Sequence, residues 1–338
     1  MDIKNKKILV TGGAGFIGSS LVKRLVGAGA DVQVLDNLSR GKLENLQYSD
    51  GKYAINLDEK FHNVDLTDYS KCLESIREVD LVYHLADIVG GIHYVFGHEA
   101  FVFRQNILIN TNVLSACVSN SIPSYIYVGT ACSFPKHLQM KDGVVALSED
   151  QTYPAQPESA YGWSKLMGEY EAELAQKSGK IQVGILRFHN VYGPMASIDP
   201  KHSQVIPSLI NKAIQYPKQP FVVWGSGAQY RDFIYIDDVI EALISMPKFG
   251  LNKGVIQIGS EVATSIREVA EKIVQISQKD IRIIFDTSRP EGDRGRVAVC
   301  DRAKNILGWK ASVNIDEGLR KTYQYVLKSS ELDNVDRN

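Results

Sequence analysis

Residues 7–18 read Lys-Ile-Leu-Val-Thr-Gly-Gly-Ala-Gly-Phe-Ile-Gly, and this stretch decides the fold of the chain. The apolar run at its start predicts a buried parallel strand. Gly12, Gly15 and Gly18 follow, and apolar residues then recur with a helical period. A strand, a glycine turn and a helix in this order let backbone N–H groups and a helix N-terminus face a pyrophosphate. The stretch therefore predicts a dinucleotide site.

A second apolar strand, residues 32–35, ends at Asp36. A carboxylate at this place can accept hydrogen bonds from an adenosine ribose and repels a 2′-phosphate, which favours NAD over NADP. Arg40 and Lys42 follow closely and leave NADP open as an alternative.

Composition narrows the class of protein. The 338 residues suggest about two domains, and contents of 44% apolar and 23% charged residues are ordinary for a globular chain. A net charge of −1 gives no basic field, so nucleic acid is not an expected partner. The charged N-terminus and the lack of a membrane-length apolar run predict no signal peptide, no membrane contact and a cytoplasmic location. The four cysteines lack C-x-x-C spacing and are expected to be reduced thiols.

Strand and helix patterns alternate along the first half of the chain. They predict an α/β fold, a Rossmann-type doubly wound parallel sheet, with ligands at the carboxyl ends of the strands near Ala86-Asp87 and Gly129-Thr130. Prolines are frequent after residue 189, where we expect a smaller, interleaved C-terminal substrate domain. The NAD-binding domain is predicted to span 1–188, with returning segments near 228–262. The sugar-nucleotide-binding domain is predicted to comprise 189–227 and 263–328. Residues 329–338 are predicted to form a flexible tail.

Tyr161 and Lys165 open a predicted helix that runs to residue 176. Because they are four residues apart, they share one helical face. An ammonium beside a phenol favours the phenolate, so we expect the pKa of Tyr161 to fall from about 10 toward the working range. A phenolate can take a proton from an alcohol as hydride leaves for a nicotinamide. Thr130, at the end of the preceding strand, supplies a hydroxyl that orients the substrate oxygen.

These motifs together resemble the extended short-chain dehydrogenase/reductases, the NAD-dependent epimerase/dehydratase family, which act on nucleotide sugars. The resemblance extends through Tyr325. It implies a tightly held NAD, a C-terminal domain that grips a nucleotide sugar, and a homodimer built on paired helices. The residues that it implies for the cofactor are Gly12, Gly15, Phe16, Ile17, Gly18, Asp36, Asn37, Asp65, Leu66, Leu85, Ala86, Tyr161 and Lys165.

Three segments, 187–194, 231–233 and 290–296, match segments of this family that bind the diphosphate and the nucleotide. Their arginines suit the task because a guanidinium can bind phosphate oxygens in a bidentate way. The substrate-binding residues implied by the resemblance are Gly91, Asn190, Arg231, Arg294 and Arg296.

Cys132 lies two residues after Thr130, just past a strand end. A thiol can remove or donate a carbon-bound proton, although many cysteines only fill a core. The 4,6-dehydratases of the family usually carry Asp-Glu after the threonine, and Ala131-Cys132 argues against that reaction. The Cys-x-x-Pro pattern instead resembles the GDP-mannose 3,5-epimerases and the GDP-fucose synthases. Segments 85–92 and 290–296 are closer to the former, and segment 199–207 is closer to the latter.

Epimerisation at two carbons requires a second acid/base on the opposite face of the sugar. In register, that position falls at Gln204 or Val205, and neither side chain exchanges protons near neutral pH. His202 is the candidate that replaces it, with Lys201 as an alternative. The simpler interpretation of His202 is a solvent-exposed histidine in a loop.

The sequence therefore predicts an NAD-dependent epimerase that oxidises C4 of a GDP-linked hexose or heptose transiently and epimerises C3, C5 or both. No metal site is predicted. Alternatives are a C4 dehydrogenase that releases a 4-keto sugar, a 4-epimerase or a 4,6-dehydratase. A non-catalytic NAD-binding scaffold is disfavoured, because a scaffold has no need of Thr130, Tyr161 and Lys165.

Overall fold

A computed structural model describes residues 1–139, 143–199, 202–289 and 294–335. Its largest sheet has the strand order β11-β7-β5-β4-β1-β2-β3, and every pairing in it is parallel. The strands are β1 (Lys7–Thr11), β2 (Asp31–Asp36), β3 (Phe61–Asn63), β4 (Leu81–His84), β5 (Ser124–Thr130), β7 (Gln182–Phe188) and β11 (Val255–Ile258). This arrangement confirms the predicted doubly wound sheet. The order reverses beside β1, and ligands of such sheets bind at that switch point.

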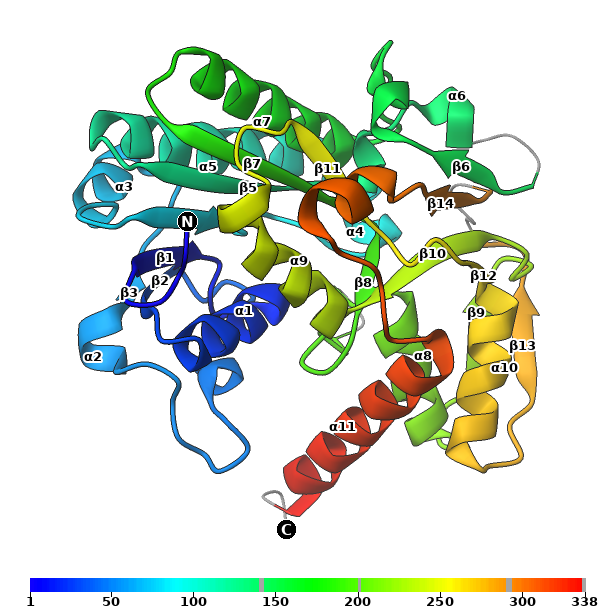
Figure 1. Cartoon of the computed structure of the whole chain (residues 1–338). Coiled ribbons are helices and arrows are strands. Elements are labelled where there is room, and N and C mark those ends of the chain that lie inside the picture. The colour runs from blue at the N-terminus through cyan, green and yellow to red at the C-terminus, as the bar shows by residue number, and fades with distance from the viewer. Residues whose placement is uncertain (140–142, 200–201, 290–293, 336–338) are drawn as a thin grey trace.

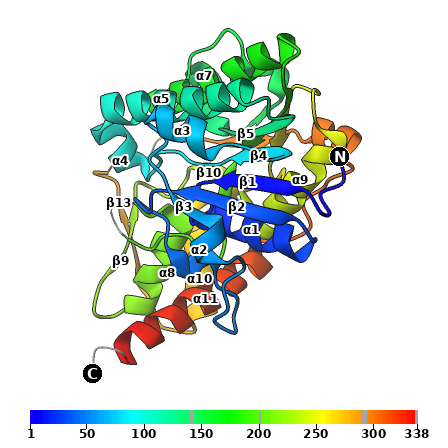
Figure 2. The same cartoon turned by 90° about the vertical axis from the view of Figure 1, so that its left-hand side faces the viewer.

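Helices cover both faces of this sheet (Figures 1 and 2). On one face lie α1 (Phe16–Gly27) and α9 (Ile236–Phe249), and on the other lie α3 (Tyr69–Ser75), α5 (Glu99–Ser119) and α7 (Ala160–Lys177). Ile8 and Val10 belong to one core, whereas Leu9 between them belongs to the other. The strands are apolar throughout because successive side chains point to opposite faces and both faces are covered.

Smaller sheets and a helical group follow in the C-terminal part of the chain. Three strands, β8 (Asn190–Tyr192), β10 (Tyr230–Tyr235) and β12 (Ala263–Ser265), form one sheet. Two pairs join β9 (Phe221–Trp224) to β13 (Ile283–Asp286), and β6 (Val145–Leu147) to β14 (Arg296–Ala298). Helices α8 (Val205–Gln215), α10 (Ile266–Ser277) and α11 (Ile315–Val335) pack together in the lower half of Figure 1. Thus β11 returns to the large sheet, while β10 does not.

Short elements complete the described chain. The short helices are α2 (Leu57–Lys60), α4 (Ile92–Gly97) and α6 (Lys136–Gln139), with single turns at η1 (Leu43–Leu46), η2 (Ala131–Ser133), η3 (Glu149–Thr152) and η4 (Ala303–Leu307). The chain was predicted to leave its last helix near residue 327 for a flexible tail, but α11 continues to Val335. The four cysteines are free thiols, as predicted.

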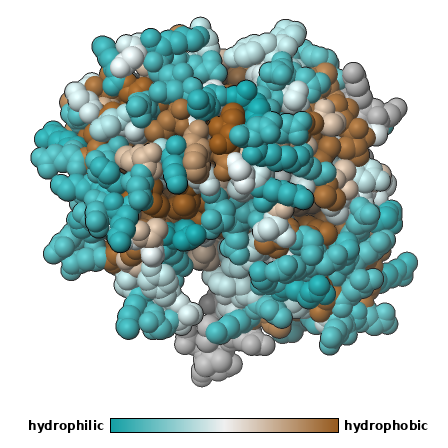
Figure 3. Space-filling model, viewed as in Figure 1, coloured by the Kyte–Doolittle hydropathy of each residue, from teal (hydrophilic) through white to brown (hydrophobic). Residues whose placement is uncertain are grey.

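The surface is a mosaic of hydrophilic and hydrophobic patches on the face shown in Figure 3. Among the described residues, no helix combines the length and the apolar content that crossing a bilayer requires.

Candidate functional site

The glycine turn between β1 and α1 is closed by backbone contacts that leave no room for a Cβ. Gly12 has φ +67°, and a Cβ on it would lie 2.8 Å from the backbone nitrogen of Ala86. A Cβ on Gly18 would overlap the carbonyl oxygen of Gly12. Within the described chain, no side chain caps the first turn of α1. The bare turn and the open helix N-terminus therefore fit the pyrophosphate of a dinucleotide.

Asp36 lies at the end of β2, beside this turn. Its two carboxylate oxygens accept hydrogen bonds from the backbone N–H groups of Ala14 (3.0 Å) and Leu38 (2.8 Å). Burial raises the pKa of Asp36, and the two hydrogen bonds oppose this change. The remaining lone pairs of the carboxylate are available to a ribose, as the sequence predicts.

The other predicted cofactor residues also follow the carboxyl ends of β1 to β4. The backbone N–H groups of Leu85 and Ala86 donate to the Thr11 hydroxyl at 3.2 and 3.3 Å, which ties the end of β4 to the end of β1. The residues that gather at this edge, besides the three glycines and Asp36, are Phe16, Ile17, Asn37, Asp65, Leu66, Leu85 and Ala86.

Tyr161 and Lys165 meet a carboxylate that comes from a different element. The Tyr161 hydroxyl donates to Oδ2 of Asp87 (3.1 Å), and Nζ of Lys165 lies 3.6 Å from the same oxygen. Lys165 is 2% exposed and its ammonium lies 4.7 Å from the centre of the Tyr127 ring. The two side chains do share one face of α7, as predicted, but Asp87 lies between their polar ends.

Burial and this carboxylate both change the pKa of Tyr161 in the direction opposite to the expected one. Burial, followed by the charge of Asp87 and the nearby Cys132, raises the pKa of Tyr161 well above its usual value. Burial lowers the pKa of Lys165, and Asp87 acts in the opposite direction. The predicted lowering of the Tyr161 pKa is therefore wrong for this arrangement, because burial and the charge of Asp87 both raise it.

The turn that carries Cys132 packs directly against the start of α7. The Thr130 hydroxyl accepts a hydrogen bond from the Cys132 N–H (3.3 Å) and caps η2. A Cβ on Gly162 would overlap the carbonyl oxygen of Cys132, so the two segments are in close contact. Cys132 is partly exposed, whereas the other three cysteines are buried. Its exposure and its place favour chemistry over core filling.

The predicted substrate-binding residues fall into two groups around this turn. Arg296, on β14, is 4% exposed, and its Nη2 lies 3.6 Å from Sγ of Cys132. A bridge between Tyr230 and Gly295 brings Arg231, on β10, close to Arg294, which precedes β14. In the second group, Gly91 is the N-cap of α4, and Asn190 is the first residue of β8. Among the described residues the buried Oδ1 of Asn190 has no hydrogen-bond partner, which is consistent with a ligand contact.

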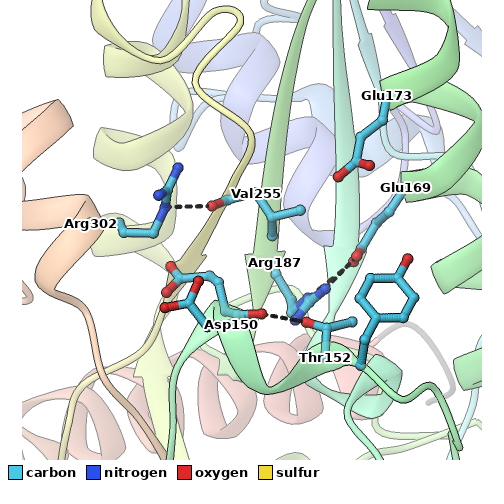
Figure 4. Close-up of a pocket in the computed structure, with 9 residues that line it drawn as sticks. Asp150, Thr152, Glu169, Glu173, Arg187, Val255 and Arg302 are labelled. Atoms are coloured by element: carbon cyan, nitrogen blue, oxygen red, sulfur yellow. Dashed lines mark hydrogen bonds and ion pairs between the residues drawn. The ribbon is translucent and has the colours of Figure 1, made fainter.

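Arg187 belongs to the same sequence segment as Asn190, but its side chain makes contacts within the fold. It lines a pocket where it points at Glu169 and Thr152 (Figure 4). Its Nε and Nη2 donate to the two carboxylate oxygens of Glu169, at 3.1 and 2.5 Å, and Nη1 donates to Thr152 at 2.9 Å. The guanidinium also lies 4.6 Å from the centre of the Phe134 ring. Arg187 therefore ties β7 to α7, and a diphosphate contact by this side chain is not what the structure shows.

His202 is not brought to Cys132. Its Nδ1 lies 3.0 Å from a carboxylate oxygen of Asp199, and its ring meets Tyr94 edge-on at 5.3 Å. A Cβ on Gly91 would lie 3.0 Å from the carbonyl oxygen of Ser203, so this loop packs on the segment that follows β4. Lys201 lies outside the described residues.

Asp87 is the residue at the site to which the sequence pattern assigned no role. A signal existed, because Asp87 directly follows Ala86 at the carboxyl end of a buried strand. Its partners could not be foreseen, since Tyr161 and Lys165 lie far along the chain.

Comparisons with known proteins identify the family of the chain. The model of the NAD dependent epimerase/dehydratase family matches residues 8–259. GDP-mannose 3,5-epimerase of Arabidopsis thaliana is 31% identical over 328 residues, which is 97% of this chain and 84% of that protein. A putative UDP-glucose 4-epimerase of Methanocaldococcus jannaschii is 30% identical, covering 94% of this chain and 98% of its own length.

A similar solved structure is UDP-glucose 4-epimerase from Thermotoga maritima, with UDP-glucose, at a TM-score of 0.85 and 27% identity. That likeness covers 96% of this chain and 99% of the other. The chain therefore belongs to the NAD dependent epimerase/dehydratase family, and its cofactor is NAD.

Proposed function

We propose that this protein is a nucleotide-sugar epimerase that inverts C3, C5 or both in a GDP-linked hexose or heptose after transient oxidation at C4. The observation that carries the proposal is the place of Cys132, a partly exposed thiol on a turn packed against Tyr161 and beside Arg296. The similarity to GDP-mannose 3,5-epimerase supports GDP as the nucleotide. The similarity to 4-epimerases of UDP-sugars makes those sugars the substrates to compare.

When bound, NAD would supply a reversible acceptor for the hydride on C4 of the sugar. The glycine turn would hold its pyrophosphate, and Asp36 its adenosine ribose. Tyr161 exchanges a proton with the C4 hydroxyl, and Thr130 orients that oxygen. Lys165 would place its ammonium beside the Tyr161 and Thr130 hydroxyls. Thr130 ends β5, and Tyr161 lies at the start of α7.

A ketone at C4 acidifies the hydrogens on C3 and C5, and Cys132 moves a proton at one of these carbons. Arg296 lies beside the thiol and would bind the diphosphate end or a sugar oxygen, together with Arg231, Arg294, Asn190 and Gly91. His202 remains the proposed second acid/base, because its loop packs on Gly91.

Solvent exchange tests the role of Cys132. In deuterium oxide, Cys132→Ala should abolish incorporation of deuterium into GDP-mannose while reduced nicotinamide still forms. Cys300→Ala, which removes a buried thiol, serves as the control and should leave incorporation intact. Incorporation by Cys132→Ala at the rate of the unmodified protein would rule out the thiol as the proton carrier.

A C4 dehydrogenase that releases a 4-keto sugar is the second candidate. It is favoured by one observation, namely that His202 contacts Asp199 and Tyr94 rather than the Cys132 turn. Absorbance near 340 nm separates the two functions when sugar nucleotides are added. A transient rise indicates an epimerase, a lasting rise indicates a dehydrogenase, and a complete lack of response favours a scaffold.

A homodimer is the proposed assembly. The neighbouring helices α5 and α7 expose large apolar side chains, among them Phe101 and Leu108 on α5 and Tyr170 and Leu174 on α7. Pairing these helices with those of a second copy would remove this apolar surface from water. The four free thiols support a reducing, cytoplasmic location.

A further inference from the structure

Arg40 joins two segments that lie on opposite sides of the glycine turn. It follows β2 in the chain, and its Nη1 donates a hydrogen bond to the carbonyl oxygen of Val89, which follows β4. In the large sheet, β1 lies between β2 and β4. The side chain of Arg40 therefore crosses the carboxyl edge of β1, where the glycine turn begins.

The loop that carries Arg40 is itself attached to the glycine turn. The carbonyl oxygen of Ala14, in the turn, accepts hydrogen bonds from the N–H of Lys42 (3.1 Å) and from Nδ2 of Asn45 (2.8 Å). A Cβ on Gly41 would lie 2.9 Å from the Cβ of Ala14, so the residue next to Arg40 packs directly on the turn. These contacts hold the base of the Arg40 side chain beside the turn.

The direction of the Arg40 side chain determines which phosphate it can meet. Its tip lies at Val89, on the β4 side of the turn, whereas the adenosine ribose is expected beside Asp36, at the end of β2. The guanidinium is therefore not aimed at the position of a 2′-phosphate. The pyrophosphate is expected in front of the turn and the helix N-terminus, which is the region that the side chain crosses.

The Arg40 guanidinium has the chemistry that a pyrophosphate requires. Arg40 is exposed, and Val89 engages Nη1 only, so the other N–H groups of the planar fork can reach a ligand. A guanidinium binds phosphate oxygens through two parallel hydrogen bonds, and these charge-assisted bonds are stronger than bonds between neutral groups.

We propose that Arg40 is a clasp that retains the bound dinucleotide, anchored on the carbonyl of Val89 while its guanidinium donates to a pyrophosphate oxygen. The pyrophosphate would then have the N–H groups of the glycine turn on one side and Arg40 on the other. Dissociation of the cofactor requires these hydrogen bonds to break, whereas association does not. The clasp should therefore act mainly on the rate of dissociation.

Retention of the cofactor has a use in the proposed function, and this part of the inference rests on that function. An epimerase returns the hydride to the sugar from which it came, so its cofactor need not leave between turnovers. A C4 dehydrogenase that releases a 4-keto sugar must release NADH in every turnover, and a clasp would slow that step. Arg40 therefore favours the epimerase over the second candidate.

Dissociation of NADH tests the clasp without any sugar. The protein is loaded with NADH and mixed with excess NAD in a stopped-flow instrument, and the loss of bound NADH fluorescence gives the rate. Arg40→Gln should release NADH about tenfold faster or more, and its association rate constant should change less than about threefold. Arg40→Lys keeps the charge but not the fork, and its rate should lie between the two. Lys52→Gln, which removes an exposed cation beside Asp50, is the control and should match the unmodified protein.

Fragments of the cofactor locate the contact. ADP-ribose carries the pyrophosphate, whereas adenosine does not, and each competes with NADH in a fluorescence titration. Arg40→Gln should bind ADP-ribose about tenfold more weakly and adenosine as the unmodified protein does. A role toward a 2′-phosphate predicts instead that the variant loses affinity for NADP and keeps its affinity for NADH.

Four results would overturn the inference. The first is an unchanged rate of NADH dissociation in Arg40→Gln, and the second is slower association alone, which indicates only attraction at a distance. The third is an equal loss of affinity for adenosine and ADP-ribose, and the fourth is a loss for NADP alone. The proposed function fails separately, because a lasting rise in absorbance with sugar nucleotides excludes the epimerase, whereas the rates of NADH dissociation still test the clasp.

Discussion

Removal of Arg187 should destabilise the fold rather than weaken substrate binding. The guanidinium donates to both carboxylate oxygens of Glu169 and to Thr152, and it stacks on Phe134. The side chains of Arg187 and Glu169 are 1% and 3% exposed, so water cannot replace either partner. In Arg187→Met, the carboxylate of Glu169 remains buried without its counter-ion.

Loss of one partner of such a buried pair costs about 3–5 kcal/mol. Most of this cost is the burial of an unpaired charge, so removing the second charge should recover much of it. Arg187→Met combined with Glu169→Met should therefore be more stable than Arg187→Met alone, by about 2 kcal/mol or more. A simple loss of packing predicts the opposite order, since the double variant lacks more native contacts.

Urea unfolding followed by circular dichroism measures these free energies, and Arg302→Met is a matched control in the same pocket because its guanidinium is partly exposed. Under conditions where Arg187→Met is folded, its KM for the nucleotide sugar should be unchanged. A loss below about 1 kcal/mol, or a raised KM with unchanged stability, would refute the assignment of Arg187 to the fold. Either result would restore the diphosphate role that the sequence segment indicates.

Further predictions concern the cofactor turn, a buried histidine and the assembly. Gly18→Ala should abolish NADH binding in a fluorescence titration, because its Cβ would overlap the backbone of the turn, whereas Gly27→Ala on the same helix meets open space and should bind normally. Burial lowers the pKa of His84 to about 3, so the unfolded chain binds more protons than the folded chain below about pH 6.5. The free energy of unfolding should therefore decrease as the pH decreases. This contribution is fully present above pH 6.5 and is lost at about 1.4 kcal/mol per pH unit on acidification, and His84→Gln should show a correspondingly smaller slope in urea unfolding at pH 4–7. Leu174→Glu should convert a dimer to a monomer in light scattering, and a dimer that persists would exclude α7 from the interface.

The large sheet could be predicted because its strands carry an unambiguous signal. Parallel strands covered on both faces are continuous apolar runs, and glycines or acids mark their carboxyl ends, as at Gly12 and Asp36. Helix α9 was not predicted, because the apolar run from Phe233 to Ile236 indicates a strand, and Pro247 lies inside the helix. The acids Asp237 and Asp238 in its first turn suit a helix N-terminus and were the available sign.

The substrate side of the site could be predicted only as a set of residues. The segments that carry Arg231 and Arg296 are distant in the sequence, and a bridge between their strands makes them neighbours. Nothing in the spacing shows that Arg296 reaches Sγ of Cys132, or that Arg187 turns to Glu169. Tertiary packing determines which buried charged groups pair with one another, and these pairings cannot be derived from the spacing of residues in the sequence.

Tyr161 and Lys165 show most clearly why local spacing does not fix chemistry. Their separation determines that they share a face of α7, and it does so in the structure. The ionisation of the phenol depends instead on its burial and on the charges around it, and the carboxylate of Asp87, 3.1 Å from the phenol oxygen, opposes the phenolate. Because Asp87 follows β4 and comes from a distant part of the chain, the Tyr-x-x-x-Lys spacing alone does not determine the ionisation of the phenol.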